Sequence, residues 1–216
     1  MCPKCRSLER HRLLWLYLTR ATDLFSSGYR RVLHIGPEPV LEQRLRSAPN
    51  VYYVSIDLHA PGVMCRADIT RLPFHDNSLD VIICYHVLEH VMDDRRAMKG
   101  LLRVLKPGGW ALLQSPVDLE REATYEDLTV DTPHERERLF GQSDHVRVYG
   151  RDYKDRLEAV GFHVKLDDYV KTLPAKLVRT FGVRSSEQIY VCTKAAGERE
   201  GVAAGTQPST RLWSKR

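Results

Sequence analysis

One apolar run constrains the fold of this chain more than any other feature. Residues Val81 to Cys84 are continuously apolar, which is typical of a central parallel strand that is covered on both faces. The polar residues His86, Glu89 and His90 follow as soon as this strand should end. In open α/β sheets the ligand crevice lies beyond the carboxyl ends of the strands. We therefore expect this His- and Glu-rich turn to lie beside whatever the protein binds.

Strands and helices alternate along the chain at the spacing of a doubly wound sheet. Apolar and β-branched runs predict strands at 31–35, 51–56, 63–66, 81–84, 110–114, 162–166 and 188–193. Helical patterns lie between them at 39–46, 93–105 and 151–160. This alternation predicts an α/β fold with a doubly wound, mostly parallel seven-stranded sheet, in which the last two strands form a terminal hairpin.

Length and composition fit one domain with short appendages. The chain has 216 residues, of which 43% are hydrophobic, and this is enough to fill the core of one α/β domain. We predict an N-terminal segment over 1–28, a main domain over 29–194 and a disordered tail over 195–216. No apolar run approaches the roughly 18 residues of a membrane span, and a signal-peptide core is not evident. Five cysteines, three of them scattered, favour a reducing cytoplasm over a disulfide framework.

The net charge of +5 lies within residues 1–31, and the rest of the chain is neutral overall. Such a basic arm could bind nucleic acid or an acidic partner. It could equally be the solvated face of a helix, because no aromatic residues are interleaved with the charges in an RNA-binding pattern.

The turn after the first predicted strand argues against a nicotinamide or flavin dinucleotide cofactor. Dinucleotide-binding proteins use several glycines there, so that a helix N-terminus can approach a pyrophosphate. This chain has Gly36-Pro37-Glu38-Pro39, and its prolines remove backbone donors. A cofactor without phosphate is therefore expected.

Three parts of the chain resemble class I S-adenosylmethionine-dependent methyltransferases, especially the small type 11 group. They are the block 79–109, Asp57, and the pair Asp68-Ile69. The resemblance covers roughly residues 30–194. It implies a Rossmann-like methyltransferase fold, S-adenosylmethionine as cofactor and methyl transfer to an acceptor, for which a small molecule is favoured over a macromolecule.

The resemblance also implies which residues bind the cofactor. Asp57 ends the second predicted strand, about 20 residues beyond Gly36, where a carboxylate can accept both ribose hydroxyl hydrogens; alternatively, it only forms a turn. Asp68 would receive the adenine amino group while Ile69 packs on the ring, or else Asp68 only ends a strand. The remaining residues assigned to the cofactor site are Gly36, Leu58, Tyr85 and His86.

The first turn departs from the family pattern. His34 occupies the position of an acidic residue that holds the methionine end of the cofactor. Glu38 is close enough in sequence to supply a replacement carboxylate, and the alternative is that it caps the next helix. This departure motivates a second hypothesis, a methyltransferase-like binding protein that has lost catalysis. The basic arm motivates a third, a nucleic-acid methyltransferase.

Methyl transfer needs an acceptor held close to the methyl carbon, and a base only if the acceptor must lose a proton. The topology makes His86 the best-placed base, with Glu89 and then His90 beside it, although His90 could instead cap a helix or orient a neighbour. In some RNA methyltransferases a Glu-His pair after the fourth strand holds a metal ion. That role requires further ligands nearby.

Residues 116–149 are polar and too long for an ordinary connection. We predict a lid over the cofactor mouth, in which Asp144 and His145 meet His86 and His145 takes part in catalysis. A solvated surface loop is the alternative.

Cys2 and Cys5 resemble half of a zinc knuckle, and residues 7–12 are similar to bacterial relatives in which a complete zinc ribbon precedes the methyltransferase domain. A closed zinc site needs four ligands, and the sequence has no second cysteine pair. His11 could be a third ligand. Free thiols or weak zinc binding are expected here, and the chain could begin midway through such a ribbon.

Overall fold

The computed structural model describes residues 1–26 and 28–196, so almost all of the predicted tail lies outside the described residues. Its central sheet has seven strands in the order β3-β2-β1-β4-β5-β9-β8. The strands are β1 (Arg30–Ile35), β2 (Val51–Asp57), β3 (Cys65–Arg66), β4 (Leu79–Tyr85), β5 (Leu105–Gln114), β8 (His163–Asp167) and β9 (Ile189–Thr193). The pairs among β1 to β5 are parallel, and β9 is antiparallel to both β5 and β8. This confirms the predicted mostly parallel seven-stranded sheet.

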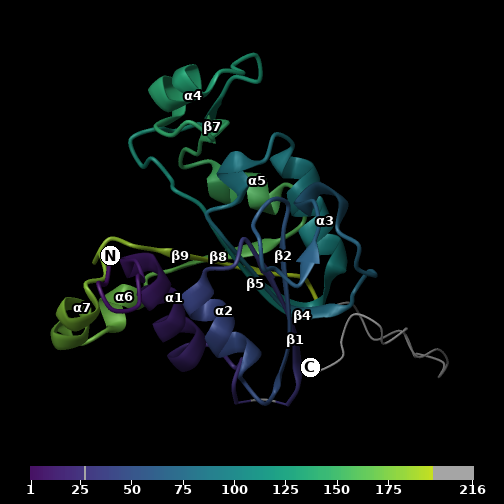
Figure 1. Cartoon of the computed structure of the whole chain (residues 1–216), viewed down its shortest axis with the longest axis vertical. Helices are drawn as coiled ribbons and strands as arrows, with labels where there is room; N and C mark the ends of the chain where they lie inside the picture. The colour runs from purple at the N-terminus through teal and green to yellow at the C-terminus, as the bar shows by residue number, and fades with distance from the viewer. Residues whose placement is uncertain (27, 197–216) are drawn as a thin grey trace.

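Helices cover both faces of the sheet (Figure 1). They are α1 (Glu9–Arg20), α2 (Pro39–Arg46), α3 (Asp94–Val104), α5 (Tyr153–Glu158), α6 (Tyr169–Thr172) and α7 (Ala175–Phe181). Successive residues of a strand point to opposite faces. Ile82 of β4 thus packs in one core with α3 and α5, and Ile83 packs in the other with α1 and α2. Double coverage explains why β4 is an apolar run without alternation. Among the described residues, no helix is long and apolar enough to cross a membrane.

Two details differ from the sequence prediction. Helix α3 ends at Val104, one residue before its predicted end, and β5 begins at Leu105 instead of the predicted residue 110. The register of β5 against β4 shifts between Leu79 and Val81. Helices α6 and α7 fill the connection between the last two strands, where no helix was predicted. Helix α7 has no fully buried residue, so its sequence carries little amphipathic signal.

The segment 116–149 forms a small structural unit of its own. It contains β6 (Tyr125–Glu126), α4 (Pro133–Phe140) and β7 (Arg147–Val148). Strands β6 and β7 pair antiparallel, and α4 begins with a side-chain cap from Thr132. Figure 1 shows α4 and β7 standing away from the body of the domain.

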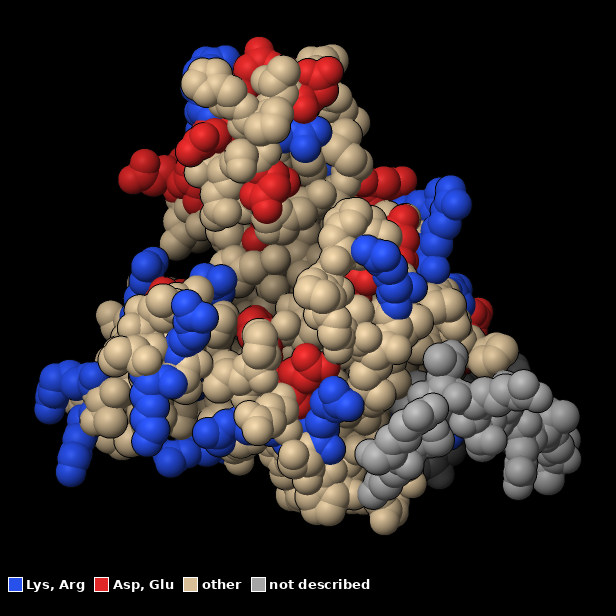
Figure 2. Space-filling model, in the orientation of Figure 1, with Lys and Arg blue, Asp and Glu red and all other residues tan. Residues whose placement is uncertain are grey.

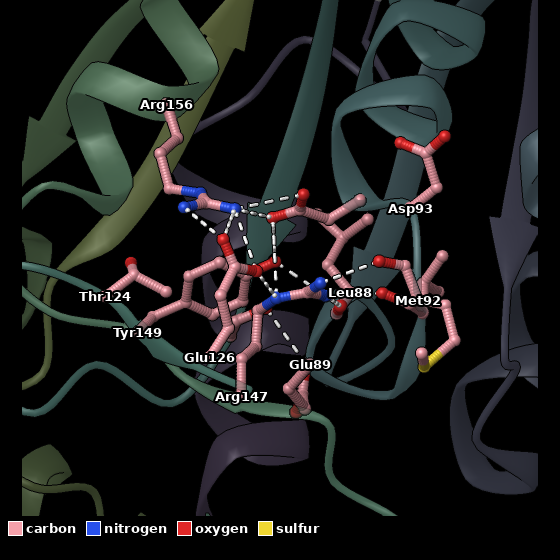
Figure 3. Close-up of polar contacts among 12 residues, drawn as sticks. Leu88, Glu89, Met92, Asp93, Thr124, Glu126, Arg147, Tyr149 and Arg156 are labelled. Atoms are coloured by element: carbon pink, nitrogen blue, oxygen red, sulfur yellow. Dashed lines mark hydrogen bonds and ion pairs between the residues drawn. The ribbon is translucent and has the colours of Figure 1, made fainter. Parts of the chain in front are cut away.

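A buried ionic cluster fixes the inner half of this segment to the domain (Figure 3). Asp94 at the start of α3 accepts from Arg156 at 3.0 Å and from the Tyr149 hydroxyl at 2.8 Å. The Arg147 guanidinium lies 3.0 Å from a Glu126 carboxylate oxygen. It also donates to the backbone carbonyls of Leu88, Val91 and Met92. Both Arg147 and Asp94 are buried, so a mobile lid is compatible only with the outer part, around α4.

Candidate functional site

A cavity of about 820 Å³ opens at the carboxyl ends of β1, β2 and β4. The predicted residues that line it are Gly36, Asp57, Leu58, Asp68, Ile69 and His86. His90, Met92 and Asp144 complete one side of it. Figure 2 shows a hollow between the projecting segment and the rest of the molecule. We call the cavity of about 820 Å³ the larger cavity.

One carboxylate oxygen of Asp57 accepts backbone hydrogen bonds, and the other lies near the turn after β1. Its Oδ1 accepts from the backbone N–H groups of His59 and Ala60, each at 2.7 Å, which is the turn-forming role considered above. The other oxygen lies 3.9 Å from the position that a Cβ on Gly36 would take. Such a Cβ would also come within 2.8 Å of Val87, and Gly36 has a φ of +60°. Glycine therefore keeps space open in front of the Asp57 carboxylate.

Asp68 and the apolar side chains near it can receive a flat heterocycle. Asp68 Oδ1 accepts from the Thr70 backbone N–H at 2.8 Å, and this bond holds the pKa of Asp68 below its usual value. Asp68 is one of the residues that line the larger cavity. Leu58 and Met92 are nearly half exposed although apolar, and Ile69 adds a buried contact. Exposed apolar side chains around one carboxylate are typical of small-molecule sites.

His34 and Glu38 form a buried chain of polar contacts behind the turn. The His34 ring lies 2.9 Å from the Tyr53 hydroxyl and 3.0 Å from Glu38 Oε2. Burial raises the pKa of Glu38, but the neighbouring His34 and His11 and a backbone hydrogen bond together lower it below its usual value. Glu38 is the N-cap residue of α2, as the helix-capping alternative predicts, but its side chain makes no capping hydrogen bond. Neither residue is among those lining the larger cavity.

Helix α1 brings two further polar groups to this region. His11 Nε2 lies 3.8 Å from Glu38 Oε1, and burial lowers its pKa. Among the described residues, His11 Nε2, Arg10 Nε and the Tyr85 hydroxyl are buried without a hydrogen-bond partner. Tyr85 packs in the core with α1 and α2 and is not among the lining residues. No sequence pattern predicted that α1 would approach this region.

His86 connects the larger cavity with a second one of about 350 Å³. Its backbone has a φ of +53°, which is unusual for a residue other than glycine. Its Nδ1 lies 3.3 Å from Glu89 Oε1. Glu89 is buried, and its other oxygen accepts from the Ser115 hydroxyl at 3.0 Å. The smaller cavity is lined mainly by polar groups, among them Arg10, Gln114, Ser115, Arg184, Glu187 and Gln188.

His145 lies beside His90 and Glu89, not beside His86 as expected. The His90 and His145 rings are 4.8 Å apart and nearly perpendicular. Asp144 contacts His90, whose Nδ1 is 3.2 Å from the Asp144 carbonyl and 3.3 Å from its carboxylate. Burial, followed by the neighbouring His90, lowers the pKa of His145. A carboxylate and two imidazoles thus meet at the edge of the larger cavity.

Cys2 and Cys5 lie in a compact N-terminal turn. Hydrogen bonds from the side chain and backbone of Ser7 lower the pKa of Cys5 to about 7, which favours the thiolate form that binds metals. His11 faces Glu38, so it is not positioned as the third ligand considered above. In the described part of the chain, this pair does not belong to a cluster of three or more potential ligands.

Comparison with known proteins agrees with this geometry. Residues 31–113 match the sequence family described as "Methyltransferase domain". An uncharacterized methyltransferase of Mycobacterium sp. strain KMS is 35% identical over 115 residues, which are 48% of this chain and 44% of that protein. The chain thus spans less than half the length of this relative.

Two solved structures share the fold. The [4+2]-cyclase SpnF is 18% identical with a TM-score of 0.60, over 88% of this chain and 82% of its own. A SAM-dependent methyltransferase from Archaeoglobus fulgidus is 15% identical with a TM-score of 0.53, over 88% and 95%. The sheet order and these two likenesses show a Rossmann-like methyltransferase fold. Residues 31–113 match the methyltransferase domain family, and the Mycobacterium relative is itself named a methyltransferase.

Proposed function

We propose that this protein transfers a methyl group from S-adenosylmethionine to a small polar acceptor. The observation that carries the proposal is the larger cavity, which Asp57 and Asp68 line together with exposed apolar side chains. A nucleoside needs this combination, because its ribose and amino group donate hydrogen bonds while its base is flat and weakly polar. Five free cysteines support a reducing location, and we propose the cytoplasm.

Each part of the cofactor has a group that suits it. Asp57 would accept from the ribose hydroxyls, and Asp68 would accept from the adenine amino group while Ile69 and Leu58 pack on the ring. The methionine end would pass Gly36 toward α1. There the Glu38 carboxylate can pair with the amino group of the methionine end. The unpartnered Arg10 Nε and His11 Nε2 can donate hydrogen bonds to the carboxylate of the methionine end.

The smaller cavity suits the acceptor. Its volume of about 350 Å³ is near the lower end of small-molecule sites. S-adenosylmethionine, when bound, presents a methyl carbon activated by positively charged sulfur. His86 borders both cavities and would remove the acceptor's proton as the methyl bond forms. Glu89 would orient the His86 ring and stabilise its positive charge. His145 remains a candidate base, although its observed neighbours are His90 and Glu89.

Two observations favour a second function. The fold is shared with a [4+2]-cyclase, and the turn after β1 lacks the usual glycines, so binding without methyl transfer is the alternative. Cofactor binding together with no product from any acceptor in a broad panel would favour it. The basic side chains of α1 and α7 favour a nucleic-acid methyltransferase, but less strongly. A steep salt dependence of RNA binding would support that function.

Replacing Asp57 by Ala should weaken the binding of S-adenosylhomocysteine by about 1–3 kcal/mol, because the ribose hydroxyls would lose their acceptor in a partly buried site. Isothermal titration calorimetry measures this difference directly. Asp155→Ala on α5 is the matched control, since Asp155 is exposed and not among the residues lining either cavity. Equal affinities for the two variants would remove Asp57 from the site.

A further inference from the structure

Three potential metal ligands converge at the edge of the larger cavity. Glu89, His90 and His145 each offer one ligand atom, and these atoms all lie within 4.8 Å of one another. They come from two distant parts of the chain. Glu89 and His90 belong to the short helix η2 (Leu88–His90), and His145 lies just before β7. A backbone hydrogen bond of 3.0 Å from Val146 to the Glu89 carbonyl joins these parts.

The Glu89 carboxylate is buried without a permanent positive partner. Only 2% of the residue is exposed, and its side-chain contacts are the His86 ring and the Ser115 hydroxyl. Among the described residues, its ion-pair partners include no Lys or Arg, whereas the Asp94 carboxylate nearby has Arg156 and Arg147. Buried carboxylates are normally paired with a cation or coordinate a metal. A cation bound next to Glu89 would therefore stabilise its buried carboxylate.

Two of the three candidate ligands are held by a neighbour. The Ser115 hydroxyl donates to one Glu89 oxygen at 3.0 Å, and the Asp144 carbonyl lies 3.2 Å from His90 Nδ1. Hydrogen bonds of this kind orient metal-binding side chains and fix which ring nitrogen of an imidazole is free. His145, the third candidate, is buried against the His90 ring.

We propose that Glu89, His90 and His145 bind a divalent first-row transition-metal ion such as Zn²⁺ or Mn²⁺. Two imidazoles and one carboxylate suit these ions better than Mg²⁺ or Ca²⁺, which prefer oxygen ligands. An ion about 2.1 Å from each ligand atom requires separations of at most about 4.2 Å. The three atoms now lie within 4.8 Å of one another, so metal binding would have to draw them closer together.

Three protein ligands leave coordination positions open, as in catalytic zinc sites. Because His90 and Asp144 line the larger cavity, an open position would face it and take water or an oxygen of the acceptor. Only this last step rests on the proposed methyl transfer. Metal binding itself can be measured without cofactor or acceptor.

The test is a titration of the metal-free full chain with Co²⁺, in a Cys2→Ser/Cys5→Ser background that removes the thiol pair. We expect one equivalent to bind, with visible d–d bands and without thiolate charge-transfer bands. His145→Ala and His90→Ala should each weaken binding more than about 100-fold, since even removal of an orienting neighbour costs about 10- to 100-fold. Ser115→Ala should fall within that smaller range.

His134→Ala is the matched control, because His134 is an exposed histidine on α4 of the same segment. Circular dichroism and the melting temperature of each variant would establish that it is folded, and His90→Ala removes the least buried of the three ligands. Absence of d–d bands at millimolar Co²⁺ in the folded background variant would overturn the proposal. Equal affinities of the His90, His145 and His134 variants would also overturn it.

Discussion

Replacing His86 by Ala should reduce methyl transfer by about 100- to 10,000-fold, the contribution usual for a positioned general base. The expectation rests on His86 bordering both cavities and on the buried Glu89 carboxylate 3.3 Å from its ring. The measurement is single-turnover methyl transfer to an acceptor identified by screening polar metabolites. The affinity for S-adenosylhomocysteine should change only several-fold, because Asp57 and Asp68 are untouched.

His75→Ala provides the comparison for this variant, since His75 is exposed and does not line either cavity. Unchanged turnover in His86→Ala would show that the acceptor needs no base or that the proton leaves by another route. Glu89 and His145 would then be the residues to test next.

Replacing Arg147 by Met should lower the free energy of unfolding by about 3–5 kcal/mol, because breaking a buried ion pair leaves its partners uncompensated. Arg147 is 1% exposed and contacts Glu126 together with three backbone carbonyls of the turn that carries Glu89 and His90. Urea denaturation followed by circular dichroism gives the value.

Arg138→Met on α4 is the corresponding surface change, for which less than about 0.5 kcal/mol is expected. A loss below about 1 kcal/mol in Arg147→Met would show that the segment 116–149 is only loosely held. The lid hypothesis could then extend to the whole segment instead of its outer part alone.

Most of the sheet was predictable because strands that are buried on both faces appear in the sequence as continuous apolar or β-branched runs. The apolar run at 81–84 and the β-branched strand at 51–56 were located correctly, and the helix at 39–46 has the predicted bounds. The short helices α6 and α7 were missed, since the pattern of α7 is weak where it buries little surface. The beginning of β5 was misjudged because residues 106–109, which include a proline and two glycines, signal a turn in the sequence alone.

Site residues were predictable where their position at the end of a strand determines where they lie in the fold. Asp57, Asp68 and His86 reach the cavity because each follows a strand end. Contacts between distant segments left no such trace. Three such contacts depend on how α1 and the segment 116–149 pack. They are the approach of His11 to Glu38, the edge-to-face contact of His145 with His90, and the anchoring of Arg147 and Arg156 by Asp94.

Calorimetric titration of the full chain with S-adenosylhomocysteine tests the central claim most directly. The account predicts one binding site with an affinity in the micromolar range, accompanied by a rise in melting temperature as the ligand saturates the folded state. No measurable heat at high protein concentration with either S-adenosylhomocysteine or S-adenosylmethionine, and no change in melting temperature, would contradict it.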